Sequence, residues 1–160
     1  MRGTDAGGRM REQEASDDAV MTRIGQAVIL LHGGDREEAR NRFGALWSEI
    51  GASADAFRRC ALAHYLADAQ DDPGDELAWD LRALAAADGG GAGAAIRAFY
   101  PALHLNLAAD YLKLQRPGAA RIHLDRAREA MAALGDGGHG PGVRTAVERL
   151  ERRLAEAEEC

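Results

Sequence analysis

The sequence has few aromatic residues and almost no lysine. Phe, Trp and Tyr together make up 5% of the 160 residues, and Lys113 is the one lysine among basic residues that are otherwise arginines. The hydrophobic fraction of 46% therefore rests largely on Ala. Alanine favours helices and lets them pack closely, whereas sheets are rich in β-branched and aromatic side chains. This composition predicts an all-α protein.

Long apolar runs and patches of positive charge are also absent. No apolar run approaches the ~20 residues of a membrane-spanning helix, and the first sixteen residues contain no apolar stretch of the kind found in secretory signals. We therefore expect no membrane partner and a cytoplasmic location. The net charge is −6, with arginines interspersed among acids. Nucleic acid is not an expected partner, because binding phosphates requires clustered basic residues.

Cysteine is limited to Cys60 and Cys160, and no Cys-x-x-Cys or Cys/His spacing connects the two. Two free thiols are expected, and a chain of this length needs no disulfide or metal to fold. A Cys60–His64 dyad would fit an i,i+4 spacing. Backbone N–H groups inside a helix are already bonded, however, and offer no oxyanion hole. With no catalytic motif found, neither enzyme activity nor a cofactor is expected.

Helical periodicity and Gly/Pro turns divide the chain into four segments. Residues 1–16 are Gly-rich and charged and predict a disordered tail. Residues 17–134 predict six helices in three consecutive pairs. Residues 135–142 (GDGGHGPG) predict a flexible linker. Residues 143–160 predict a last helix with a narrow apolar stripe.

Several local features are predicted within the helical region. Asp35 is expected to cap the second helix, with Glu38 completing a capping box. The glycines after Asp88 predict a flexible break, and Pro101 predicts a kink or restart of the fifth helix. The apolar stripe of the fourth helix is expected at Leu77, Leu81 and Leu84.

The first and third helix pairs share one spacing of small and large residues. The intervals three, nine, four and three separate Ala27, Leu30, Ala39, Phe43 and Leu46, and again Ala108, Tyr111, Ala120, Leu124 and Ala127. A small residue lets two helices approach, and large neighbours lock their crossing. The middle pair keeps only Ala63, Leu66 and Ala78 of this pattern, with three extra residues in its turn.

This spacing resembles the tetratricopeptide repeat, and the segment LHLNLAADYLKLQRPGAARIHLDRA, residues 103–127, matches it best. The stretches HYLADAQDDPGDELAWDLRAL and FYPALHLNLAADYLKLQ also look like an uncharacterised family of bacterial tetratricopeptide-like proteins, which brings no activity with it. The resemblance covers about residues 20–134. It implies a right-handed stack of three helix-turn-helix pairs, with residues 143–160 as a C-terminal capping helix. A homodimer contact through the last helix is the alternative use of its stripe.

In tetratricopeptide proteins the first helix of each pair lines a concave groove that binds a protein or peptide. By position, the resemblance places in this groove His32, His64, Asp68, Leu105, Asn106, Ala109 and Lys113. Asn106 falls where some relatives hold a peptide backbone or carboxylate, but Met21 and Ile24 stand where their clamp has other residues. The expected function is an adaptor or scaffold with a mixed polar and apolar groove. A second copy of the chain, or the 1–16 tail, is the alternative occupant.

A different hypothesis is a small-molecule- or metal-binding protein or enzyme. It would use His64, Asp68, His104 and Asp110, since imidazole and carboxylate suit divalent metals. No His-x-x-x-His or Glu-x-x-His motif is present, so no metal ligands are predicted. His64 and Asp68 share a helix face at i,i+4, a spacing that fits a ligand-binding pair and equally a tie between neighbouring helices.

Overall fold

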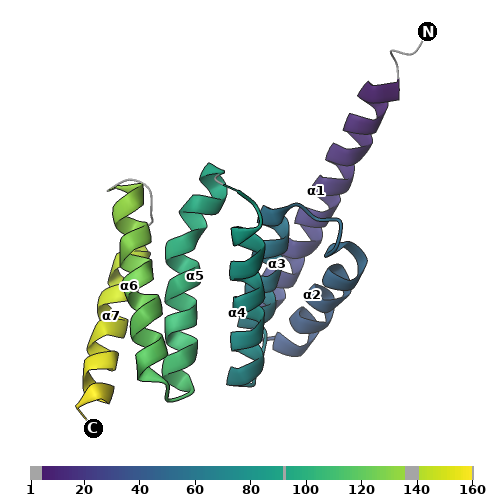
Figure 1. Ribbon diagram of the computed structural model, residues 1–160. Coiled ribbons are helices and arrows are strands. Elements are labelled where there is room, and N and C mark those ends of the chain that lie inside the picture. Colours follow the sequence, from purple (N-terminus) through teal and green to yellow (C-terminus); the bar gives the residue numbers. More distant parts are fainter. Residues whose placement is uncertain (1–4, 92, 136–140, 160) are drawn as a thin grey trace. The chain divides into compact units, whose positions relative to one another are not determined.

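The computed structural model describes residues 5–91, 93–135 and 141–159. In this part of the chain it has no strand and seven α-helices (Figure 1): α1 (Asp5–His32), α2 (Arg36–Ile50), α3 (Ala56–Asp68), α4 (Pro73–Asp88), α5 (Ala94–Lys113), α6 (Pro117–Leu134) and α7 (Pro141–Glu158). The prediction of an all-α protein is confirmed. No helix among the described residues is both long enough and apolar enough to cross a bilayer. The chain forms two compact units, Met1–Ala52 and Ser53–Cys160.

The first unit is a pair of helices, α1 and α2, joined by a tight turn. Ala27 on α1 packs out of solvent, as do Ala39, Phe43 and Leu46 on α2. The turn is closed by Gly34, whose φ of +91° lies in the left-handed region that glycine adopts freely. These buried positions are the small and large residues of the predicted spacing.

The beginning of α1 differs from the prediction. Composition predicts a disordered tail over residues 1–16, but α1 extends back to Asp5, and residues 1–4 lie outside the described part. Residues 6–16 are exposed on every side. The segment buries no apolar side chain, since even Met10 is 66% exposed. Local contacts such as the hydrogen bond from Gln13 to Asp17, 3.1 Å long, support the helix instead.

The start of α2 also departs from the predicted capping box. Asp35 occupies the N-cap position, but its side chain makes no capping hydrogen bond. Glu38 pairs instead with Arg42 one turn later, at 3.0 Å. The acidic residues of the first turn still complement the partial positive charge at the helix N-terminus.

The second unit contains α3 to α7, with α5 at its centre. α4 packs between α3 and α5, α6 packs between α5 and α7, and α5 also touches both α3 and α7. Figure 1 shows α5, α6 and α7 side by side, coloured from teal to yellow. The predicted stripe of α7 packs within this unit: a core cluster is formed by Ala108, Ala120, Leu124, Val147, Leu150 and Leu154. The chain's own α5 and α6 therefore cover the α7 stripe.

The buried face of α4 is not the predicted leucine stripe. Leu81 is 41% exposed, and Ala78, expected to follow the repeat spacing, is exposed. The buried residues of α4 are Asp80, Ala83, Ala86 and Ala87. Because α4 contacts helices on two sides, small side chains on this face let both neighbours approach.

Pro101 causes no break in α5, which runs uninterrupted from Ala94 to Lys113 with the proline inside it. Proline lacks the N–H that an interior position donates to the preceding turn. Its ring is buried here, so packing compensates for the lost hydrogen bond. The expected restart of the helix at this residue is wrong.

The glycines between α4 and α5 were predicted to form a flexible break, but two of them have specific structural requirements. A Cβ atom on Gly90 would overlap the side chains of Ile96 and Ala56. Gly91 has a φ of +77°, in the region that residues with a side chain avoid. Gly90 is therefore required because there is no space for a side chain, and Gly91 is required because of its backbone conformation.

Candidate functional site

A line of polar side chains crosses the second unit from α3 through α4 to α5. We call it the polar seam, and it consists of His64, Asp68, Glu76, Asp80, Asn106, Asp110 and Lys113. On each helix its members are three or four residues apart, so that they share a face. The helix contacts α3–α4, α4–α5 and α3–α5 bring the three faces together.

His64 connects the three helices of the polar seam. Its Nδ1 lies 3.0 Å from Asn106 Nδ2 and 3.9 Å from Asp80 Oδ1, while its Nε2 lies 3.5 Å from Asp68 Oδ2. Burial alone would lower the pKa of His64, but the nearby carboxylates of Asp80 and Asp68 raise it above the ordinary value. The surroundings of His64 therefore stabilise its charged form.

Three carboxyl groups meet at the α4–α5 end of the seam. Glu76, Asp80 and Asp110 each place one oxygen within 4.8 Å of the others, and Asp80 and Asp110 are only 2% and 1% exposed. Burial, followed by the hydrogen bond to Asp80 and the charges of Asp80 and Glu76, raises the pKa of Asp110 far above its ordinary range. In the absence of a cation, these surroundings therefore stabilise the neutral form of the Asp110 carboxyl.

Lys113 closes this end of the seam toward solvent. Its Nζ lies 2.9 Å from Glu76 Oε2 and 3.1 Å from Oε1. The lysine side chain is 45% exposed and that of Glu76 is 20% exposed. The ion pair therefore lies at the edge of the buried carboxyl groups, where water screens it.

Four of the predicted groove residues come together in the seam: His64, Asp68, Asn106 and Lys113. Leu105 and Ala109 face α7 instead, and His32 is an exposed residue at the end of α1 in the other unit. Sequence reasoning missed Glu76 and Asp80. Their signal was a stripe of acidic and small residues on α4, which the more hydrophobic leucine stripe obscured.

The alternative set of His64, Asp68, His104 and Asp110 does not form one site. His104 belongs to a separate aromatic column, in which Tyr100, His104, His123 and Tyr111 stack with centroid separations of 6.1, 5.4 and 5.4 Å. His104 Nδ1 lies 3.1 Å from His123 Nδ1. Three of the four proposed ligands thus belong to the polar seam, and His104 contacts His123 instead.

Cys60 is unsuited to act as a nucleophile. It is a free, buried cysteine on α3, one turn before His64. Burial, and secondarily the charge of Asp80, raises the pKa of its thiol to about 12. Because the thiolate is the reactive species, the protonated thiol argues against a Cys60–His64 dyad.

A pocket of about 230 Å³ lies between α5 and α7 in the second unit. The residues lining it are Leu105, Asn106, Ala109, Ala146, Arg149, Leu150 and Arg153. Three of them are predicted groove residues, and α7 adds two arginines that the prediction did not include. Within the described part of the chain, no carboxylate forms an ion pair with Arg149 or Arg153. The pocket therefore combines an apolar lining, an amide and two guanidinium groups without a fixed counterion.

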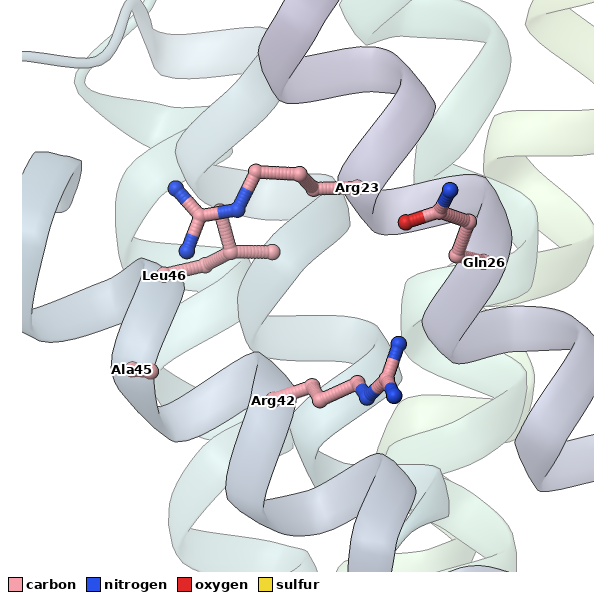
Figure 2. A pocket seen from close by; sticks show the side chains of 5 residues that line it. All are labelled: Arg23, Gln26, Arg42, Ala45 and Leu46. Carbon is pink, nitrogen blue, oxygen red and sulfur yellow. The ribbon is translucent and has the colours of Figure 1, made fainter.

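The first unit has a pocket of similar size, also about 230 Å³, between α1 and α2. Figure 2 shows Arg23 and Gln26 on one helix facing Arg42, Ala45 and Leu46 on the other. Both guanidinium groups are already paired, Arg23 with Glu49 at 2.6 Å and Arg42 with Glu38 at 3.0 Å. This pocket is the weaker candidate for binding an anion.

Comparison of the chain with protein-family models, with curated proteins and with solved structures finds no match.

Proposed function

We propose that the chain is a partner-binding module of the tetratricopeptide type, which holds a short segment of another protein in the pocket between α5 and α7. Two features support the repeat architecture. Four of the five positions of the shared spacing are buried in each pair, and the fifth, Leu30 or Tyr111, is partly buried. In the second unit, the contacts of α5 with α3 and α7 are those of a layer of alternate helices.

The composition of the α5–α7 pocket is the observation that carries the proposal. Arg149 and Arg153 are exposed, stand one turn apart on α7 and line the same pocket as Asn106. A guanidinium group binds a carboxylate through two parallel hydrogen bonds, and an asparagine amide can bind a peptide backbone. Leu105 and Leu150 provide apolar surface beside these groups.

The occupant that fits is an extended peptide segment with a carboxylate next to an apolar side chain. The carboxylate is either an acidic side chain or a C-terminal carboxylate, since both present the same two oxygens. The net charge of the chain is −6, so this local positive charge would select acidic segments at one place on a surface that otherwise repels them. A reducing compartment such as the cytoplasm suits the free thiol of Cys60.

A displayed library of random peptides tests this proposal. We expect the full chain to enrich peptides that carry Asp, Glu or a free C-terminus beside an apolar residue. Binding of the enriched peptides should weaken at least tenfold in Arg149→Glu and in Arg153→Glu, and it should weaken with added salt. Arg152→Glu makes the same charge change on α7, outside the pocket, and should bind as the wild type does.

Three results would contradict the proposal. One is a library selection without any preference for carboxylates. Another is equal weakening by Arg152→Glu, which would indicate a general effect of charge. If the peptides preferred by the wild type bind both pocket variants unchanged, the pocket is not the site.

A further inference from the structure

We propose that Glu76, Asp80 and Asp110 bind one divalent metal ion between α4 and α5. This site is distinct from the α5–α7 pocket, and the proposal does not depend on the binding of a peptide there. Glu76 and Asp80 are one turn apart on α4, and Asp110 projects from α5 toward them.

The spacing of the three carboxyl groups fits a single ion. Oxygens that coordinate one cation at about 2.1–2.5 Å lie within about 5 Å of one another. The three side chains each place one oxygen within 4.8 Å of the other two. No rearrangement of the two helices is needed to bring them to a common ion.

Two of the carboxylate oxygens point independently to a missing positive partner. Asp110 Oδ2 and Asp80 Oδ1 are completely buried and accept no hydrogen bond in the described part of the chain, and the imidazole of His64 approaches Asp80 Oδ1 only to 3.9 Å. A buried oxygen without a partner is costly, and buried charges in proteins are normally paired or bound to metal. One cation between the two helices would satisfy both oxygens.

The charges around the trio leave room for a divalent ion. Lys113 contacts only the Glu76 member, at 2.9 Å, and His64 Nδ1 lies 3.9 Å from Asp80 Oδ1. Binding of an ion would release the proton of Asp110, and the ion would then face three carboxylates of which Glu76 alone contacts the ammonium group at the solvent edge. Because Lys113 is 45% exposed, its side chain can move into solvent and give an ion access past Glu76.

The ligand chemistry favours a manganese-like ion. Carboxylates suit Mg²⁺, Ca²⁺ and Mn²⁺, while a nearby imidazole suits transition metals. Mg²⁺ usually retains several water molecules and Ca²⁺ takes six to eight oxygens. A buried site with three carboxylates has little space for several water molecules and offers fewer oxygens than Ca²⁺ takes. Because His64 lies at its edge, we assign the site to Mn²⁺ and to other ions that accept both carboxylate and imidazole ligands.

Titration of the metal-stripped full chain with Mn²⁺ tests the assignment. Calorimetry should show one Mn²⁺ per chain, and saturation should raise the melting temperature. Asp110→Asn and Asp80→Asn keep the size of the side chain but remove a ligand charge, and we expect each to weaken binding at least tenfold. Asp75→Asn removes one charge from an exposed position on α4 and should bind as the wild type does.

The proposal is overturned if the wild type shows no saturable binding at millimolar Mn²⁺, or if both cluster variants bind as the wild type does. If Asp80→Asn does not fold, Asp110→Asn alone decides. Mg²⁺ binding as tight as Mn²⁺ binding would overturn the assignment of the ion class. The electron paramagnetic resonance spectrum of bound Mn²⁺ reports on coordination of the ion itself, so a change in protein stability alone would not alter it.

Discussion

The Nδ1 atoms of His104 and His123 lie 3.1 Å apart across the α5–α6 interface, and the two rings are stacked. One nitrogen must donate a hydrogen and the other must accept it, so the contact requires at least one neutral ring. Burial, His123 and Arg126 lower the pKa of His104 to about 4 against an opposing effect of Asp88. Burial and Arg126 also lower the pKa of His123.

The His104–His123 pair should therefore contribute less and less stability to the second unit as the pH falls from about 6.5 toward 4, while Asp110, whose pKa is raised, acts in the opposite sense over this window. Across this window the unfolded chain binds protons at the ordinary histidine pKa of 6.5, whereas folded His104 resists protonation down to about 4. At His104 the unfolded state then holds the additional proton and is favoured. Urea unfolding, followed through Trp79 in a Trp47→Phe background, isolates this contribution when the wild type is compared with His104→Phe. As the pH falls, the wild-type midpoint should fall relative to that of His104→Phe but not relative to that of His32→Gln; a constant difference from His104→Phe would refute the role of the pair.

Leu154→Ala should destabilise the second unit by about 2–4 kcal/mol, because it leaves a cavity among buried residues. Leu154 is 1% exposed and packs in the cluster with Leu124 and Val147. The control is Ile122→Ala on the surface of α6, where the side chain is 54% exposed, and its effect should stay within about 0.5 kcal/mol. Chemical denaturation measures both. Equal effects would mean that α7 does not contribute to the core.

Cys60 should resist thiol reagents in the folded protein. Its side chain is buried and the pKa of its thiol is raised to about 12, so little thiolate is present or accessible at pH 8. In a Cys160→Ser background, Ellman's reagent should react at least 100-fold more slowly with native than with urea-unfolded protein. Fast labelling of the native chain would show that α3 opens readily.

Asn106→Ala should weaken binding of the selected peptides about tenfold and destabilise the second unit by about 1 kcal/mol. The variant removes a pocket amide and the 3.0 Å contact with His64, and a single hydrogen bond contributes about 1 kcal/mol. Asn41→Ala, an exposed position on α2, is the matched control. Loss of stability without loss of peptide binding would limit Asn106 to a structural role.

Gly7→Ala with Gly8→Ala should strengthen the exposed first turns of α1. Each glycine inside a helix costs about 1 kcal/mol relative to alanine, and a Cβ atom at either position meets no atom within 4 Å. Carbon chemical shifts in residues 5–16 should move toward helical values. No change would mean that this segment does not hold a helix in solution, as composition alone predicts.

The sequence predicted the packing that depends on local spacing. The stripe on α7 is buried at Val147, Leu150 and Leu154, and the paired alanines Ala39 and Ala120 lie in helix contacts. Such positions are readable because burial on a helix repeats every three to four residues. The packing of α7 against α5 and α6 follows from the same stripe.

The spacing of large apolar residues did not predict the buried face of α4, because the largest apolar side chains of this helix are not its most buried ones. Leucines are the most hydrophobic residues there, yet Leu81 is 41% exposed while Ala83 and Ala87 are fully buried. A helix held between two neighbours uses its small face for contact. Asp80 lies on that face, so an analysis that assigns charged residues to solvent misses it.

The polar seam was only partly predictable because its contacts join distant positions. The pairing of His64 with Asp68 follows from their spacing, but that with Asn106 spans 42 residues and that of Lys113 with Glu76 spans 37. Nothing local selects these partners. The arginines of the α5–α7 pocket escaped prediction for the same reason, since the last helix was expected either to cap the stack or to form a homodimer contact.

Gly89, Gly90 and Gly91 look interchangeable in sequence, but the fold assigns them different tolerances. Gly89 has open contacts at 3.5 Å or more, so an alanine fits there. Gly90 admits no side chain because of Ile96 and Ala56, and Gly91 is fixed by its positive φ. A designer who recombines these helix pairs into longer arrays should therefore carry the α4–α5 joint over intact, because a generic glycine–serine spacer of equal length would not reproduce it.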